Sequence, residues 1–489
     1  MARPAPQGAA AAAVQNPPKT AVVVIHGMGE QRPMETLRGL VSALWSCDRD
    51  VVKEREKAVY SKPDAITGSF ELRRITTRNG ELEAGGHKRV DFFEFYWAHL
   101  MTGNTVASVA GWAAGLLIRR PSSVPRRLIL PWLAGLGLML VTVVLLALAA
   151  AEGPLKDKLD LPLPGGQGHW YLAASIFALL FGVISTAWLA PVAGDAARYL
   201  SPTPDNVDAR QKIREAGVDL LTQLHQSGRY DRIVVIGHSL GSVIGFDVLN
   251  CAWGRIAPGE WSRRHPAGSD ALKALAATER AAGELIHAEG AAIGPARIAY
   301  RAAQRAYLDA LARPPSGFAP VWLVSDFVTL GCPLSKADVL LARDANDLIR
   351  LKREREVPSC PPWLEKNDPK QKRFRFSYPV DEPVRTPHHA AVFAPVVFTN
   401  VYFGWFAIAF GDIISGAVAP LLGRGVLDVH LKIGAPVFRH LDYWKDPTAH
   451  PPHPWLKALR RAVNLKRIDD VAVWGAQATA DPVEGDALP

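Results

Sequence analysis

The segment 237–241, Gly-His-Ser-Leu-Gly, holds the residues best suited to chemistry in this chain. It follows a short apolar run and precedes a helical pattern over 242–249, so the order strand, tight turn, helix is predicted. A serine at the apex of such a turn, here Ser239, projects its hydroxyl above a sheet as a nucleophile. Gly237 and Gly241 remove the side chains that would clash across the turn. The alternative is an ordinary strand-to-helix turn that contains a serine.

Size, charge and cysteine content limit the classes of protein to which this chain can belong. The 489 residues suffice for one large domain with insertions or for two to three average domains, and the net charge of +9 favours anionic surfaces. Nucleic acid is not an expected partner, because zinc-finger spacings and recognition-helix signatures are missing from the sequence. The cysteines, which show no paired spacing, argue against a disulfide framework or a zinc site and fit a reducing compartment. They are Cys47, Cys251, Cys332 and Cys360. We expect no metal and no cofactor, and the sequence leaves the oligomeric state open.

Short apolar runs alternate with amphipathic segments along the chain. Strands are expected over 21–25, 70–77, 90–97, 233–236, 321–331, 391–402 and 426–433, and helices over 36–45, 207–226, 269–288 and 295–312. This alternation predicts an α/β fold with a mostly parallel sheet.

Two uncharged runs, 128–151 and 170–193, stand apart from this pattern. Each exceeds the roughly 20 apolar residues that a helix needs to cross a bilayer. The linker between them is rich in Pro and Gly, which predicts a two-helix transmembrane hairpin over 128–193. Aromatic residues near the ends of the runs would form an interfacial belt. They are Trp132, Trp170, Tyr171 and Trp188. Two buried core helices are the alternative.

Basic residues flank the predicted hairpin on both sides and set its orientation. They are Arg119, Arg120, Arg126 and Arg127 before it, and Arg198, Arg210, Lys212 and Arg214 after it. The positive-inside rule predicts an inner-membrane protein with two spans and its catalytic domain in the cytoplasm. The expected division is a disordered tail over 1–19, a catalytic domain over 20–127 and 194–477 with an insertion over 261–314, the hairpin, and a disordered tail over 478–489.

The strand ending in 26–29, the turn at 237–241, the strand ending in 329–334 and the later Asp and His segments together resemble the α/β-hydrolase superfamily, on its lipase and esterase side. The turn and the helix after it are also similar to those of intracellular phospholipase A1 enzymes. The resemblance covers most of the chain outside the hairpin and tails. It implies an α/β-hydrolase fold in which the insertion forms a helical cap. A membrane hairpin inside the domain departs from the family's usual soluble form.

The resemblance also implies a catalytic triad in the chain order Ser, Asp, His. Asp412 lies in an apolar, Gly-flanked loop after a strand and is expected to orient the histidine, whereas its rival Asp326 lies inside a strand. His440 lies beyond the last expected strand and is the expected base, within hydrogen-bond reach of Ser239. His430, inside that strand, is its rival.

Two backbone N–H groups should form the oxyanion hole. One belongs to Leu240, directly after the nucleophile. The other is expected from Met28, with Gly27 and Gly29 allowing close backbone approach.

These residues predict a membrane-anchored serine hydrolase that cleaves a carboxylic ester through an acyl-enzyme. Its expected partners are a lipid or other acyl-ester substrate and the bilayer, whose anionic headgroups would attract the positive charge. A thioesterase or acyltransferase of the same fold, and a non-catalytic membrane scaffold, remain as alternatives.

Overall fold

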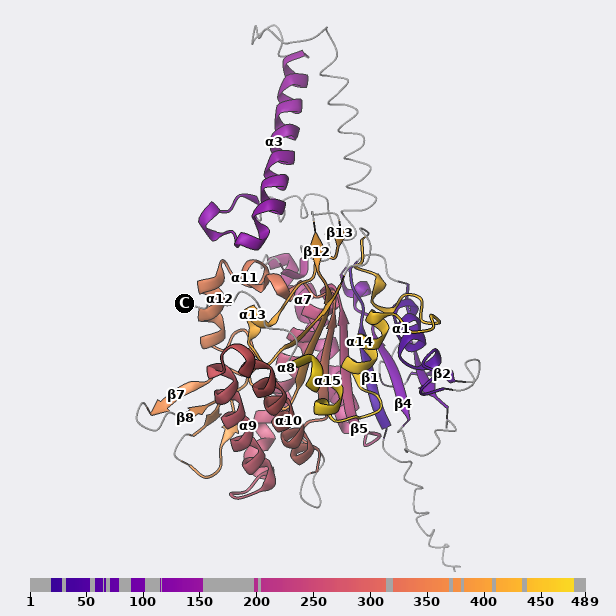
Figure 1. The fold of residues 1–489 in the computed structure, drawn as a ribbon, viewed down its shortest axis with the longest axis vertical. Coiled ribbons are helices and arrows are strands. Elements are labelled where there is room, and N and C mark those ends of the chain that lie inside the picture. Colours follow the sequence, from indigo (N-terminus) through magenta and orange to yellow (C-terminus); the bar gives the residue numbers. More distant parts are fainter. Residues whose placement is uncertain are drawn as a thin grey trace, which may run out of the picture.

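The computed structural model describes residues 19–478 except 29–31, 53–57, 65, 67–70, 79–88, 102–114, 116, 153–197, 201–203, 314–319, 369–372, 380–381, 407–409 and 433–437. An eight-stranded sheet in the order β14-β11-β6-β5-β1-β4-β3-β2 lies at its centre (Figure 1). Its strands are β1 (Lys19–Ile25), β2 (Val59–Pro63), β3 (Arg73–Thr77), β4 (Val90–Phe95), β5 (Tyr230–His238), β6 (Val324–Leu330), β11 (Val397–Phe403) and β14 (Leu427–Leu431). The pairs from β14 to β4 are parallel, and the pairs β4–β3 and β3–β2 are antiparallel.

Helices cover both faces of the sheet, which explains why its central strands are apolar on both sides. Side chains alternate along β1: Val23 and Ile25 join one core cluster, and Val22 and Val24 join the other. The first cluster includes residues of α7 (Pro204–Gln226), α8 (Leu240–Arg264), α9 (Asp270–His287) and α10 (Ile293–Ala312). The second includes residues of α1 (Glu35–Val41), α14 (Pro454–Val463) and α15 (Asp470–Ala478).

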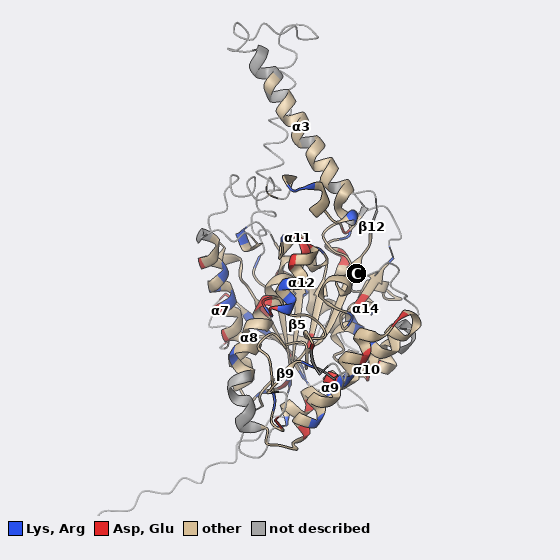
Figure 2. Cartoon of the chain, turned by 90° about the vertical axis from the view of Figure 1, so that its left-hand side faces the viewer, with Lys and Arg blue, Asp and Glu red and all other residues tan. Residues whose placement is uncertain are grey.

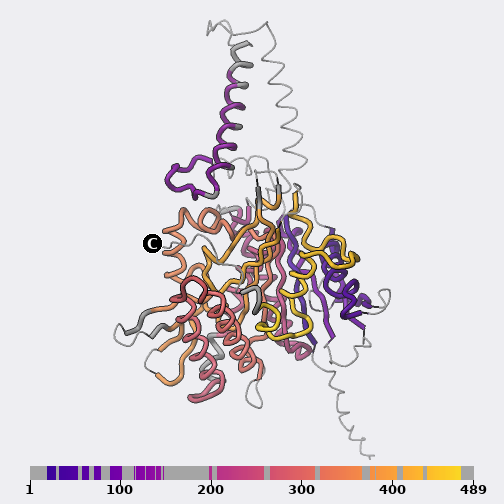
Figure 3. Tube along the Cα trace, viewed as in Figure 1, coloured from indigo at the N-terminus to yellow at the C-terminus, as the bar shows by residue number. Residues whose placement is uncertain are grey.

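The described part of the chain also contains shorter helices and strand pairs. They are α11 (Ala337–Leu340), α12 (Ala345–Arg353), α13 (Ala419–Leu422), and the two-stranded pairs β7 (Glu365–Asp368) with β8 (Arg373–Arg375), β9 (Ser377–Tyr378) with β10 (Thr386–Pro387), and β12 (Trp405–Phe406) with β13 (Phe410–Gly411). The first and last parts of the chain lie side by side (Figure 3). There Arg460 of α14 donates to the carbonyl oxygen of Ala43 at 2.9 Å. Of the predicted tails, 1–19 and 478–489, Lys19 belongs to β1 and Ala478 to α15, and the other positions lie outside the described residues.

The insertion over 261–314 does not cap the carboxyl ends of the strands, contrary to the expectation. Its helices α9 and α10 pack instead at the end of the sheet where the parallel strands begin (Figure 1). Tyr300 and Gln304 of α10 donate to the carbonyl oxygens of Phe393 and Val396, just before β11, at 2.6 and 2.8 Å. Buried polar groups need such partners, and these contacts fix α10 at the amino ends of the strands.

The predicted transmembrane hairpin over 128–193 is wrong. Among the helices that the structure describes, none combines the length and the apolar character required to cross a membrane. The first run forms helix α3 (Ile129–Glu152), and the second run, 170–193, lies outside the described residues. The prediction relied on the absence of charge over two windows, whereas a hairpin requires a complete apolar helix in each arm.

Candidate active site

Ser239 lies in the strained turn between β5 and α8. Its backbone φ is +53°, in the left-handed region that costs a non-glycine residue about 1–3 kcal/mol. A Cβ atom at Gly237 would lie 2.6 Å from the Cα atom of Ser242, and one at Gly241 would overlap the carbonyl oxygens of Ile25 and His26. Both glycines are therefore required sterically for the turn and for its packing against β1.

The Oγ atom of Ser239 is buried and has no hydrogen-bond partner among the described residues; the residue is 1% exposed. The expected hydrogen bond from Ser239 to His440 is thus not formed in this state. Catalytic hydrogen bonds are often long or misaligned before a substrate binds, and unpaired buried hydroxyls are otherwise uncommon.

Asp412 and His440 meet at the carboxyl edge of the sheet, although 28 residues separate them. Asp412 follows β11, and His440 follows β14, the neighbouring strand. The Nδ1 atom of His440 lies 2.9 Å from Oδ2 and 3.0 Å from Oδ1 of Asp412. A carboxylate only accepts hydrogen bonds, so Nδ1 carries the proton and Nε2 is left as the basic nitrogen. This is the tautomer that a general base for serine requires.

The carboxyl group of Asp412 is ionised at neutral pH. Burial alone would raise its pKa, but hydrogen bonds from His440, Tyr443 and Ser415, together with the electrostatic interaction with the His440 ring, lower the pKa to about 2. Asp412 therefore holds a full negative charge opposite the imidazole.

Two contacts bring the His440 loop to Ser239. His238, directly before the serine, donates from Nε2 to the carbonyl oxygen of His440 at 2.9 Å. The N–H of Ser239 donates to the carbonyl oxygen of Leu330 at 2.9 Å. Gly331 follows Leu330, and a Cβ atom on this glycine would lie 3.0 Å from the His440 ring. Burial lowers the pKa of His238 to about 3, so this histidine stays neutral and acts as a hydrogen-bond donor.

The loop after β1 packs against Ser239. A Cβ atom at Gly27 would lie 3.0 Å from the Cβ atom of Ser239. Met28 comes next and is half-buried, whereas Gly29 lies outside the described residues. Leu240 begins α8, whose first N–H groups have no partner within the helix and carry its positive dipole end. Both segments thus pass beside Ser239.

His26 fixes this loop, a role that sequence reasoning missed. Its Nε2 accepts from the N–H of Trp97 at 3.3 Å, its Nδ1 donates to the carbonyl oxygen of Gly27 at 2.9 Å, and its ring stacks on Trp97. Burial lowers the pKa of His26 to about 4, so it stays neutral. The only signal in the sequence was its position at the end of an apolar strand.

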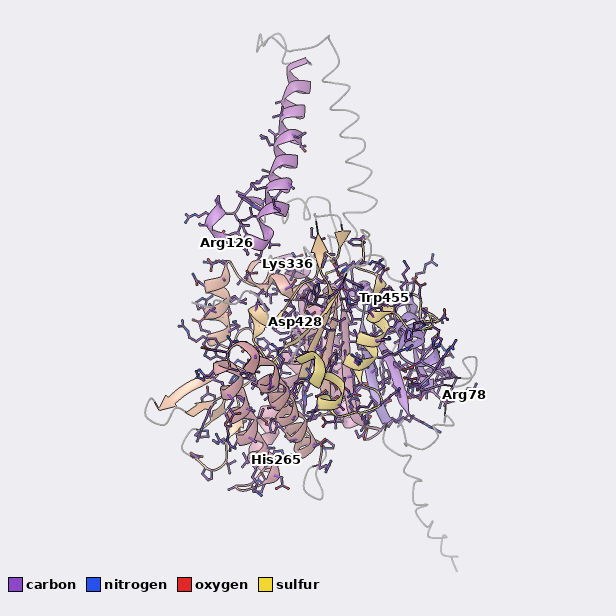
Figure 4. The ribbon with its side chains drawn as sticks, in the orientation of Figure 1. Arg78, Arg126, His265, Lys336, Asp428 and Trp455 are labelled. Carbon is purple, nitrogen blue, oxygen red and sulfur yellow. The ribbon has the colours of Figure 1, made fainter. Side chains whose placement is uncertain are left out.

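Two further side chains hold the loop that carries Asp412; both are labelled in Figure 4. Lys336 donates to the carbonyl oxygen of Ile414 at 2.7 Å. Asp428 of β14 accepts from the N–H groups of Val418 and Ala419 at 3.0 and 2.8 Å. The loop that carries Asp412 is therefore braced by a residue that follows β6 and by a residue of β14, and these two strands lie on either side of β11.

Asp326 and His430, the rival candidates for the acid and the base, are not part of this arrangement. Asp326 is buried within β6 and pairs with Arg232 at 2.6 Å and with Arg305 at 2.5 Å. Burial alone would raise the pKa of Asp326, but the two guanidinium groups hold it well below its usual range. His430 is exposed on β14 and stacks on Tyr402 at 5.0 Å between ring centroids. Among the described residues, no group of His, Cys, Asp and Glu side chains could hold a metal ion.

Comparison of the chain with models of protein families, with curated proteins and with solved structures finds no match.

Proposed function

We propose that this chain is a serine hydrolase of the α/β-hydrolase superfamily that cleaves a carboxylic ester. The observation that carries the proposal is the buried Asp412–His440 pair, which lies beside the strained turn of Ser239 at the carboxyl ends of parallel strands. Ligands of open parallel sheets bind at this edge.

The proposed reaction has two halves. Nε2 of His440 removes the hydroxyl proton as Oγ of Ser239 attacks the ester carbonyl carbon, and Asp412 stabilises the imidazolium that forms. The N–H groups of Leu240 and Met28 bind the developing oxyanion. Collapse of the tetrahedral intermediate breaks the bond to the alcohol, which leaves with the proton from His440. Water then attacks the acyl-serine by the same route and releases the acid and the free serine.

Labelling by a fluorophosphonate probe and turnover of a p-nitrophenyl ester test this chemistry. Ser239→Ala should lose both, with kcat reduced by about 10⁶-fold, because the nucleophile is removed. Ser227→Ala is the control, since its hydroxyl binds the Leu224 carbonyl in a distant turn. Equal turnover by Ser239→Ala and the parent protein would contradict the proposal.

A lipid ester is the proposed substrate class, because apolar side chains are exposed near the site. Phe438 and Leu441, on either side of His440, are 51% and 61% exposed. Helix α3 stands away from the domain at the same end of the molecule as β12 and β13, which follow β11 (Figure 1). Along α3, Leu140 and Val143 are 63% and 57% exposed.

Helix α3 is the proposed contact with an anionic bilayer at the cytoplasmic face of the inner membrane. A helix need not cross a bilayer to bury apolar side chains in it. In Figure 2 the described part of α3 is tan, the colour of residues other than Lys, Arg, Asp and Glu. Arg120 and Arg126 are exposed beside its base, where they suit anionic headgroups. Arg119 fixes this base to the domain by donating to Val339 and Arg343 carbonyl oxygens at 2.9 and 3.2 Å.

Vesicle flotation tests the contact. Leu140→Asp with Val143→Asp should abolish binding to vesicles that contain anionic lipid. Val207→Asp, at a valine of α7 that is 46% exposed, should leave binding unchanged. Equal flotation of the double variant and the parent protein would remove α3 from the proposal and leave the esterase chemistry untouched.

The alternatives separate in the same assays. A thioesterase would prefer acyl thioesters over oxygen esters, and an acyltransferase would form a new ester when a second alcohol is added. A non-catalytic scaffold would not be labelled by the fluorophosphonate probe.

A further inference from the structure

Tyr443 touches the acid of the site and has no part in the mechanism above. It lies three residues after His440, in a short 3₁₀ helix (Asp442–Trp444), and is fully buried. Its hydroxyl donates to Oδ2 of Asp412 at 2.7 Å and accepts from the N–H of Phe403 at 3.3 Å. Burial raises the pKa of Tyr443 well above its usual range, so the hydroxyl keeps its proton and remains a donor.

Four residues donate hydrogen bonds to the carboxylate of Asp412. His440 reaches both oxygens, Tyr443 reaches Oδ2, and the N–H groups of Ile414 and Ser415 donate to Oδ1 at 3.0 and 3.3 Å. Oδ2 is therefore shared between the imidazole and the phenol. Without the phenol, rotation of the carboxylate about its Cβ–Cγ bond would be opposed on the Oδ2 side by the imidazole alone.

Packing holds the phenol in place. A Cβ atom at Gly331 would lie 3.0 Å from Cε2 of Tyr443, and equally 3.0 Å from the His440 ring. Both rings thus pack against Gly331. On its other side, Tyr443 packs against the ring of Phe403 at 5.1 Å between centroids.

We propose that Tyr443 is a positioning residue that acts on catalysis through Asp412. It holds the carboxylate in the orientation that presents Nε2 of His440 to Ser239. This inference rests on the proposed hydrolase function for its kinetic consequence, but the orientation of His440 is measurable without any turnover.

Tyr443→Phe removes one oxygen atom and tests the inference. Hydrogen bonds to charged groups are strong enough that kcat should fall roughly tenfold, with KM unchanged because the phenol does not reach the substrate. The loss should be absent in an Asp412→Asn background, because the acceptor through which Tyr443 acts has been altered. Tyr300→Phe is the control: it also removes a buried hydroxyl, which donates to Phe393, and should leave kcat unchanged. Additive losses in the double variant would overturn the inference.

A matched pair of unnatural residues at position 443 separates hydrogen bonding from packing. p-Aminophenylalanine keeps a donor and should restore kcat, whereas p-methylphenylalanine fills the same volume without one and should not. Equal kcat for the two proteins would leave Tyr443 a packing residue and refute the proposal.

Proton NMR supplies the readout that does not depend on activity. The Nδ1 proton of His440, bonded to Asp412, should give a downfield resonance that disappears in His440→Ala. In Tyr443→Phe this proton should exchange with water faster, because the pair is less firmly held. Unchanged exchange would overturn the positioning role. Faster exchange in a protein with no esterase activity would instead retain that role and refute the proposed function.

Discussion

At the residue scale, the proposed chemistry depends on which nitrogen of His440 carries the proton. Asp412 binds the Nδ1 side, at 2.9 Å, and so reserves Nε2 for the serine. His238 secures the same residue through its backbone carbonyl, 2.9 Å away. The side chain and the main chain of His440 are thus held by separate partners, which makes the ring orientation a property of the folded site.

We predict unequal losses of activity when the acid and the base are replaced. His440→Ala should lower kcat about as far as Ser239→Ala, by around 10⁶-fold, because nucleophile and base act as a unit. Asp412→Asn should cost about 10⁴-fold, since a weakened base remains. Steady-state kinetics on the p-nitrophenyl ester measure both. A His440→Ala protein that retains most of its turnover would remove this histidine from the site, and His430→Ala would then be the variant to examine.

Acid stability should report the charge on Asp412. The pKa of Asp412 is about 2 when folded, below the ordinary value of 3.8, so its ionised form stabilises the fold above about pH 4. That contribution, roughly 2 kcal/mol, should be lost as pH falls from about 4 to about 2. In Asp412→Asn the free energy of unfolding should fall less over this interval. Urea unfolding at several pH values measures it, and parallel curves for the two proteins would contradict the assignment.

At the scale of elements, the site is made by the segments that follow neighbouring parallel strands. Ser239 follows β5, Asp412 follows β11, His440 follows β14, and the loop with Met28 follows β1. Gly331, which follows β6, is the residue on which the rings of His440 and Tyr443 meet. Glycine suits this position for two reasons: its φ of +62° is unfavourable for other residues, and a side chain would crowd the two rings.

Gly331→Ala should therefore lower kcat and destabilise the fold. The added Cβ atom would press on the His440 ring from 3.0 Å, and the positive φ adds backbone strain of about 1 kcal/mol. Gly228→Ala is a matched control, because Gly228 has the same φ of +62° and nothing within 4 Å of its Cβ position. It should lose similar stability and keep its kcat. Loss of activity in both variants would show that strain alone, not contact with His440, is responsible.

At the scale of the whole molecule, a buried ion network joins the sheet to the C-terminal helix. Asp326 of β6 binds Arg232 of β5 and Arg305 of α10, and Arg305 also binds Asp470 of α15 at 3.1 Å. Arg232 extends the network by donating to the carbonyl oxygen of Asn464 at 2.8 Å. These contacts lie at the amino ends of β5 and β6, away from Ser239.

Asp326→Asn should accordingly be a stability variant. Removing one member of a buried ion pair costs about 3–5 kcal/mol, because the partner charge is left without compensation. Turnover per folded molecule should stay near that of the parent protein, in contrast to Asp412→Asn. Urea unfolding and active-site titration together measure the two quantities. A folded Asp326→Asn protein without activity would reopen Asp326 as the acid.

Sequence alone was enough for the turn at 237–241 and for most of the central strands. The turn is governed by steric contacts between residues close in the chain, as the crowding at Gly237 shows, and glycine spacing reports those contacts directly. Buried parallel strands appear as apolar runs for a similarly local reason. The pattern missed β2 (Val59–Pro63), an antiparallel strand at the sheet edge with no buried side chain.

Only the tertiary structure decided which groups meet. Strand order and the loops between strands bring Asp412 to His440 and place Tyr443 and His26 where they support the site. The same order keeps Asp326 away from Ser239, in an ion pair with Arg232. Strand order depends on packing of the whole chain, which no local window contains. The same limit explains why the expectation of a cap at 261–314 is wrong, because only the contacts of α10 with the segment before β11 place these helices at the amino ends of the strands. The predicted hairpin at 128–193 is wrong on a different ground, since no described helix has both the length and the apolar character to cross a membrane.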